Sequence, residues 1–93
     1  MKVRILGKNW NLQFVPRLGK NEAGEDKAGD CDHPEAKNKS IRVLSGLRGE
    51  KRLDTIIHEF LHAADWTKDE EWVAASAHDL ARILTRLGYK EDE

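Results

Sequence analysis

Apolar residues recur at helical spacing between Leu53 and Trp66. The residues on this face are Leu53, Ile56, Ile57, Phe60, Leu61 and Ala64. Such spacing predicts an amphipathic helix that packs on a core. His58 and His62 share a second face of the same helix, because residues four apart project side by side.

A second helical pattern follows Trp66 and runs to Leu87. Thr67 and Glu70 predict a capping box with Thr67 as the N-cap, and Gly88 occupies the C-terminal cap position. The residues expected on its core face are Val73, Ala77, Leu80, Leu84 and Leu87. The two helices should therefore meet at a tight corner close to the second histidine.

Alternating apolar and polar residues from Val3 to Val15 predict a β-hairpin that turns at Gly7-Lys8-Asn9. The apolar face of this hairpin is expected to cover the helices. Residues 17–40 are polar, lack periodicity and are expected to form a long loop. Residues 40–45 alternate again and predict a further short strand.

The fold class that follows is α+β. We expect an N-terminal antiparallel hairpin plus the further strand, then the two helices, in one domain spanning residues 1–93. Strand 41–45 leads into the histidine helix. It can lie at the rim of a cleft and bind an extended peptide along its main chain, or it can be paired on both sides.

The composition excludes several classes of function. The 93 residues include 16 basic and 17 acidic side chains, for a net charge of −1. This balance argues against a nucleic-acid partner and against attraction to an anionic membrane. No apolar run has the length of a membrane span or the form of a signal peptide. Cys31 is the only cysteine, which fits a reducing compartment, so we expect a cytoplasmic protein.

The histidine helix carries the pattern His58-Glu59-x-x-His62. Two imidazoles four residues apart can hold one zinc ion at about 2.0–2.1 Å each. The Glu between them points too far round the helix to be a ligand and handles the proton of a metal-bound water. A merely solvated helix face would usually carry Lys or Glu, whereas these histidines lie within an apolar run. The pattern therefore predicts zinc, with Glu59 as the general base.

A catalytic zinc site needs a third protein ligand. The candidates downstream are Asp65, Asp69, Glu70, Glu71 and His78. Helical phase favours Glu70 over Glu71, because Glu70 lies on the flank of the core face and Glu71 shares a polar stripe with His78. The alternative for Glu70 is that it only completes the capping box.

The chain resembles the gluzincin group of zincin metallopeptidases in the run His58-Glu59-Phe60-Leu61-His62 and in the Glu that follows at the start of the next helix. The run from Glu70 to Leu80 is similar to the glutamate helix of the small ImmA/IrrE-type proteases. The lead-in Leu-Asp-Thr-Ile-Ile-His-Glu is similar to SprT-like domains. The resemblance covers residues 40–87. It implies a minimal zincin-like fold and a zinc-dependent endopeptidase, with His58, His62 and Glu70 as ligands and Glu59 as general base.

The sequence also departs from these families. Metzincins have Gly and then His or Asp after the second histidine, where this chain has Asp65 and Lys68. Many gluzincins support a ligand histidine with an Asp four residues after the ligand Glu; Ala74 stands there, which leaves Asp54 and Asp65 as candidates.

An oxyanion donor is expected as well, and the sequence offers His78, Tyr89 or an arginine. The rival hypothesis is a non-catalytic zinc module that serves stability or binds a protein partner. In that module Cys31 or His33, from the polar segment, fills the fourth position and closes the site.

Overall fold

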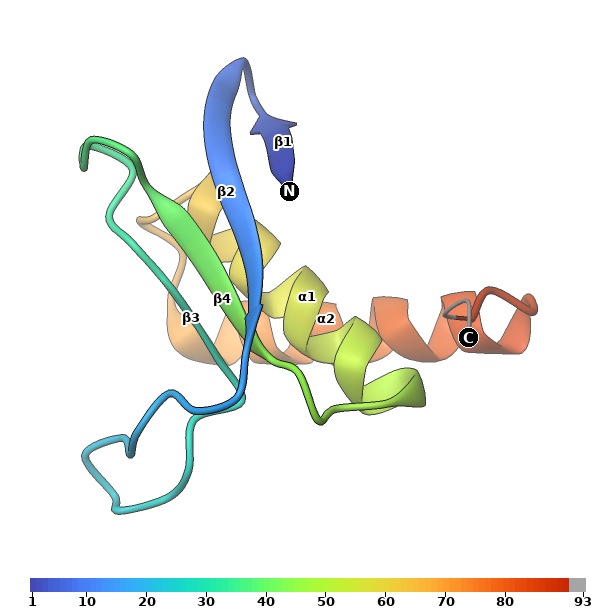
Figure 1. Cartoon of the computed structure of the whole chain (residues 1–93). Coiled ribbons are helices and arrows are strands. Elements are labelled where there is room, and N and C mark those ends of the chain that lie inside the picture. The colour runs from blue at the N-terminus through green and yellow to red at the C-terminus, as the bar shows by residue number, and fades with distance from the viewer. Residues whose placement is uncertain (91–93) are drawn as a thin grey trace.

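The computed structural model describes residues 1–90 and shows the α+β class that the sequence predicts (Figure 1). Four strands that form one mixed sheet come first along the chain, and two helices follow. The elements are β1 (Lys2–Ile5), β2 (Lys8–Val15), β3 (Gly29–Cys31), β4 (Ser40–Leu44), α1 (Gly49–Ala64) and α2 (Glu70–Arg86). In space the strands follow the order β1-β2-β4-β3.

The N-terminal hairpin forms where the alternation predicts it. β1 and β2 pair antiparallel with Val3 opposite Trp10, and Trp10 is buried in the cluster that joins the sheet to α1. The turn comes earlier than predicted, at Leu6 and Gly7, whose φ angles are 48° and 80°. A two-residue hairpin turn of this kind needs positive φ at both positions, so Lys8 already belongs to β2.

β4 lies inside the sheet. It pairs parallel with β2 and antiparallel with β3, so main-chain hydrogen bonds occupy both of its edges. Peptide binding along strand 41–45 is therefore a wrong prediction, because that strand has no free edge. The edge position next to it belongs to β3, a three-residue strand inside the segment that was expected to be loop.

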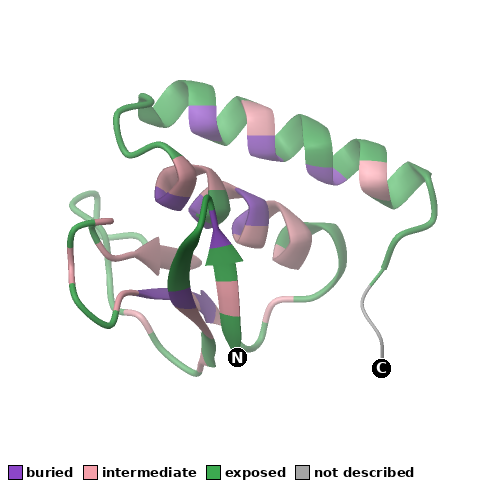
Figure 2. Ribbon diagram, turned by 90° about the horizontal axis from the view of Figure 1, so that it is seen from above, coloured by how far each residue is buried: buried purple, intermediate pink, exposed green. Residues whose placement is uncertain are grey.

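α1 lies between the sheet and α2 (Figure 2). On one side Ala63 and Ile56 pack against the strand cluster that includes Trp10. On the other side Ile57 packs against Ala77 of α2. Within residues 1–90, α1 is the one helix or strand that α2 approaches closely. α1 therefore packs against other elements on two sides, whereas α2 has a single neighbour.

α2 buries a narrower face than its pattern predicts. Val73, Ala77 and Ala81 are fully buried, but Leu80 is 42% exposed and Leu87 is 69% exposed. The prediction that these two leucines lie in the core is wrong. α2 packs on one helix only, and its alanines allow that helix to come close, so the buried face is a single narrow row.

The start of α2 also differs from the prediction. Asp69 is the N-cap and accepts a hydrogen bond from the main-chain N–H of Trp72 at 2.7 Å. Thr67 instead donates its hydroxyl to Asp65 at 2.6 Å. The predicted capping box with Thr67 is therefore wrong, and Glu70 becomes the first helical residue, with its carboxylate available for contacts outside the helix.

Of the other helix ends, the C-terminal end of α2 agrees with the sequence prediction and the N-terminal end of α1 does not. Gly88 comes directly after the C-cap of α2 with a φ of 95°, as predicted. α1 begins at Gly49, earlier than the pattern from Leu53 onward predicts. Phe60, expected on its core face, is 43% exposed.

In the described part of the chain, no helix has the length and apolar character needed to cross a membrane.

An ion-pair network joins the edge strand β3 to β4. Arg42 donates from Nε to Asp30 and from Nη2 to Asp32, at 2.6 Å in each case. Asp32 also accepts a hydrogen bond from the main-chain N–H of Ser40 at 2.9 Å. The hydrogen bond from Arg42 is the largest cause that holds the pKa of Asp32 below its ordinary value of 3.8.

We expect Asp32 to stabilise the fold at neutral pH and to lose this contribution in acid. Because its pKa is lower in the folded chain than in the unfolded chain, the stabilisation is present above about pH 4 and is lost as the pH falls through the lowered folded value. Urea unfolding of the wild type and of Asp32→Asn at pH 7 and pH 2.5 measures this. The wild type should have the higher midpoint at pH 7, and the difference should be smaller at pH 2.5; equal midpoints at pH 7 would contradict the expectation.

Candidate metal centre

His58 and His62 lie side by side on the face of α1 between its two packed sides. Their Nε2 atoms are 3.2 Å apart, and the side chains are 21% and 19% exposed. Helical periodicity puts both imidazoles on one face. The sheet and α2 hold α1 from either side, so this face has a fixed position at the edge of the core.

Glu70 completes a group of three with the histidines. Its Oε1 lies 2.8 Å from Nε2 of His58, and its Oε2 lies 2.8 Å from Nε2 of His62. Among the described residues these three form the one group of potential metal ligands, with ligand atoms within 4.8 Å of one another. The group does not include the other candidates, which are Asp65, Asp69, Glu71 and His78. The helical phase of α2 and the tight corner before it produce this arrangement.

The spacing of the two histidine nitrogens fits a zinc ion. In a tetrahedral site with bonds of about 2.0–2.1 Å, neighbouring ligand atoms are roughly 3.3 Å apart. The two imidazole nitrogens are 3.2 Å apart. Two histidines and one glutamate also form a donor set that zinc uses in catalytic sites, where three protein ligands leave one position open.

Hydrogen bonds alone would satisfy the three side chains of this group poorly. Glu70 accepts hydrogen bonds from both histidines only if each Nε2 carries a hydrogen, because a carboxylate has no proton to donate. The 3.2 Å contact between the two Nε2 atoms would then be no hydrogen bond, because neither nitrogen would have a lone pair to accept with. A divalent cation accepts lone pairs from all three side chains at once. The chemistry of the donor set therefore favours a metal ion.

Glu59 lies in the same cavity as the group and is only 7% exposed. Burial is the largest cause that raises the pKa of its carboxyl from 4.5 to about 7. The negative charges of Glu70 and Asp30 act in the same direction, and Lys27 acts against them. A buried carboxylate beside the ligands is the type of group that transfers protons in such a site.

Gly29 allows β3 to approach α1 directly over Glu59. A Cβ atom at this position would lie 2.8 Å from Cγ2 of Thr55, 3.0 Å from Cγ of Glu59 and 3.1 Å from the carbonyl oxygen of Arg42. The hydroxyl of Thr55 itself donates a hydrogen bond to the carbonyl oxygen of Lys51 at 2.9 Å, so this side chain has little freedom to move. The close approach of β3 is what buries Glu59 at the cavity wall.

We expect Gly29→Ala to destabilise the fold by about 1–3 kcal/mol, because the added methyl group forces β3 away from α1. The matched control is Gly46→Ala, since a Cβ there meets no atom within 4 Å and its φ is not in the left-handed region. Urea unfolding of both variants checks the expectation. Equal losses of stability would show that the contact with Thr55 and Glu59 is not the cause.

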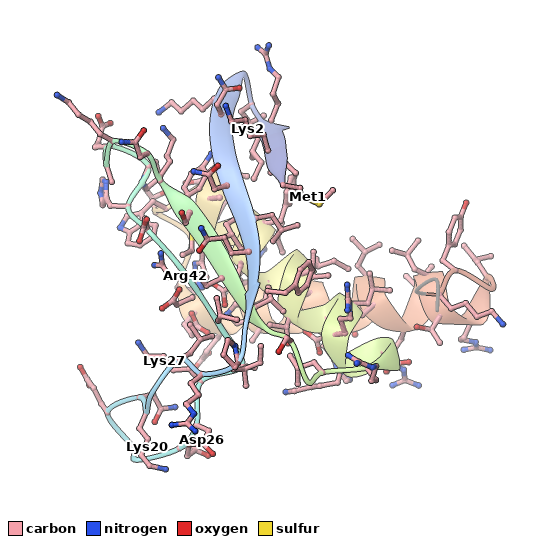
Figure 3. All side chains as sticks on the ribbon, in the orientation of Figure 1. Met1, Lys2, Lys20, Asp26, Lys27 and Arg42 are labelled. Carbon is pink, nitrogen blue, oxygen red and sulfur yellow. The ribbon has the colours of Figure 1, made fainter. Side chains whose placement is uncertain are left out.

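A cavity of about 640 Å³ encloses the group and opens to solvent. Its lining includes β3, the loop before β3, one face of α1 and the first residue of α2. Three lysines also line it, Lys27, Lys51 and Lys68, and sequence reasoning missed them. Figure 3 shows Lys27 next to the loop in which Lys20 and Asp26 form an ion pair at 3.0 Å. The lysines come from separate segments with no shared motif, so only the fold brings them together.

Cys31 lines the cavity but does not belong to the ligand group. Its thiol donates to the carbonyl of Asp32 at 3.3 Å. Burial, and after it the charge of Glu59, raises the pKa of the thiol to about 12. His33 stacks on Trp66 with ring centroids 4.9 Å apart. Within residues 1–90, neither Cys31 nor His33 belongs to the ligand group, which the rival hypothesis would have one of them complete.

The carboxylates considered as supports for the ligand histidines have other partners. Asp54 of α1 lies 3.4 Å from Nδ1 of His78 on α2. Asp65 accepts hydrogen bonds from Thr67. Asp54 thus links the two helices and Asp65 shapes the corner between them. Trp66 is the ring that packs near His62, with centroids 6.3 Å apart.

The residues considered as oxyanion donors do not line the cavity. Tyr89 lies past the C-terminal end of α2 and lines a different cavity with residues of the first turns of α1. His78 faces Asp54, and Arg42 is held by Asp30 on β3. No arginine is among the residues that line the cavity. These candidates therefore lie outside the lining of the cavity, and the three lysines are the cationic side chains that line it.

The likeness of the chain to known proteins was tested in three ways. Comparisons with protein-family models, with curated proteins and with solved structures found no match. The function is therefore inferred from the geometry of the site.

Proposed function

We propose that this chain is a zinc-dependent metallopeptidase that hydrolyses internal peptide bonds. The convergence of His58, His62 and Glu70 within 4.8 Å supports this most directly. A structural zinc site uses four protein ligands, whereas this group supplies three and faces an open cavity. Glu59, buried in the wall of the same cavity, adds the acid–base group that hydrolysis needs.

Each residue of the site has a distinct role in this proposal. His58, His62 and Glu70 would hold the zinc ion, which would lower the pKa of water and polarise a carbonyl group. Glu59 takes a proton from the attacking water and passes it to the leaving amine. The walls around Glu59 keep its carboxylate in place beside the ligands.

The three cavity lysines stabilise negative charge in this proposal. Lys27, Lys51 and Lys68 line the same space as the ligand group. An ammonium group near the reacting carbonyl stabilises the oxygen as it gains negative charge. Among these residues, Lys27 also acts on Glu59, because its charge lowers the pKa of that carboxyl.

The free edge of β3 is the proposed binding site for the peptide. The carbonyl of Ala28 and the N–H of Asp32 bond to β4. In an antiparallel pair the main-chain groups of alternate residues point to the same side, so those of Gly29 and Cys31 point to the free edge. Both residues line the cavity. An extended substrate that adds a strand here would pass along the ligand group.

Hydrolysis of an unbiased peptide library by the zinc-loaded protein tests the proposal. We expect new peptide termini that disappear when a chelator removes the metal and return when zinc is added. One bound zinc per chain without cleavage of any peptide would favour the non-catalytic zinc module. A chain that binds no zinc would overturn the proposal.

A further inference from the structure

A second apolar face runs along α2. Trp72, Leu80, Ile83 and Leu87 are 46%, 42%, 54% and 69% exposed. With Ser76 between the first two, their spacing follows one line along the helix. We call this line the α2 stripe, and its residues are Trp72, Ser76, Leu80, Ile83 and Leu87.

The α2 stripe lies on one flank of α2, beside the face that packs on α1. The residues that α2 buries, among them Val73, Ala77 and Ala81, each follow a stripe residue by one position, which is about 100° around the helix axis. Single exposed apolar residues are ordinary, but four large ones in a continuous line indicate a contact surface.

The order of charges along α2 favours a second copy of the same helix as the partner. On the exposed side of α2, the acidic Asp79 comes before the basic residues Arg82 and Arg86. Antiparallel pairing of two copies about Leu80 brings Asp79 of one helix toward the basic end of the other. Parallel pairing would set like charges together. We propose that two copies of this chain associate through their α2 stripes, antiparallel and about a twofold axis.

A twofold axis close to Leu80 uses the whole α2 stripe. Trp72 then lies opposite the partner's Leu87, and Ile83 lies opposite the small side chain of the partner's Ser76. Leu80 packs beside the partner's Leu80 at the axis. A helix pair of this length buries roughly 1,000 Å² in total, which reaches the lower bound for specific interfaces. The dimer is therefore expected to be reversible.

This association leaves the candidate metal centre accessible. Glu70 lies on the flank of α2 that faces the histidines of α1, whereas the stripe lies on the other flank of its buried face. Antiparallel pairing puts the two N-terminal ends of α2, and with them the two cavities, at opposite ends of the interface. The inference does not depend on the proposed function.

Sedimentation velocity on the full chain, from 5 to 500 µM and with and without zinc, tests the dimer. We expect the mass to rise with concentration from 10.6 kDa toward twice that value. Ile83→Glu should raise the dissociation constant at least tenfold, because it places an unpaired charge in the interface. Ala75→Glu puts the same charge on an exposed part of α2 outside the stripe and should leave the dissociation constant unchanged. Far-UV circular dichroism checks that both variants fold.

Cross-linking tests the antiparallel arrangement. Trp72→Cys mixed with Leu87→Cys should form a disulfide between copies under mild oxidation, whereas Trp72→Cys alone should not. Both cysteine variants also carry Cys31→Ser, so that the native thiol of this partly exposed residue takes no part. A wild type that stays at the mass of one chain at 500 µM, or a dimer that Ile83→Glu leaves unchanged, would overturn the proposal and assign the stripe to a different partner.

Discussion

Glu59→Gln is expected to keep one zinc per chain and to lower the rate of peptide hydrolysis by roughly 10³-fold, the usual size of a lost acid–base group. Gln has the shape of Glu but cannot take up the proton of the attacking water. Because burial raises the pKa of Glu59, a neutral side chain of the same shape should not destabilise the fold. Zinc content by elemental analysis and initial rates on one cleaved peptide measure both effects.

The matched control for this prediction is Glu71→Gln. Glu71 is exposed on α2 and stands outside the ligand group, so its substitution should change neither zinc content nor rate. Full activity in Glu59→Gln with zinc bound would remove Glu59 from the reaction. Loss of zinc together with loss of activity would show that Glu59 acts on the metal site and not on the proton.

The helices could be predicted from the sequence because each has a periodic pattern of its own. The face that α2 buries could not be predicted in full. Leu80 and Leu84 fit the same pattern, yet Leu80 is 42% exposed while Leu84 packs against α1. A periodic pattern gives the direction of an apolar face, whereas the width of the buried part depends on how many neighbours the helix has. α2 has one, and the α2 stripe is the part of its apolar surface that this neighbour does not cover.

The strands show a different limit. β1, β2 and β4 alternate over four residues or more, so the sequence pattern predicts them. β3 has only the residues Gly29, Asp30 and Cys31, none of which favours strands. It is a strand because it pairs with β4 and because Gly29 lets it approach α1. Those contacts join segments far apart in sequence, so local patterns do not reveal them.

The residues of the candidate site also differ in how well the sequence predicts them. His58, Glu59 and His62 are close in sequence on one helix, so the motif alone brings them together. Glu70 depended on helical phase, which pointed to the correct side of α2 although the predicted capping box was wrong. The cavity lysines and the free edge of β3 depend on the path of the loop before β3, and sequence reasoning had no means to place them.

Glu70→Ala is expected to weaken zinc binding by at least about 100-fold, more than the loss of an outer support, because it removes one of three ligands. The matched variant Glu71→Ala should bind zinc like the wild type. Elemental analysis after dialysis and competition with a chromogenic chelator measure the stoichiometry and the affinity.

The same pair of variants can be followed by thermal unfolding. A ligand that binds only the folded chain at 1,000 times its dissociation constant adds about 4 kcal/mol of stability. At about 4–8 °C per kcal/mol for a chain of this size, zinc should raise the Tm of the wild type by roughly 15–30 °C. A 100-fold weaker site loses about 2.7 kcal/mol of this, so zinc should raise the Tm of Glu70→Ala by only about a third as much. Equal zinc-dependent shifts in Glu70→Ala and Glu71→Ala would show that Glu70 is not a ligand, and its contacts with the two histidines would then be hydrogen bonds alone.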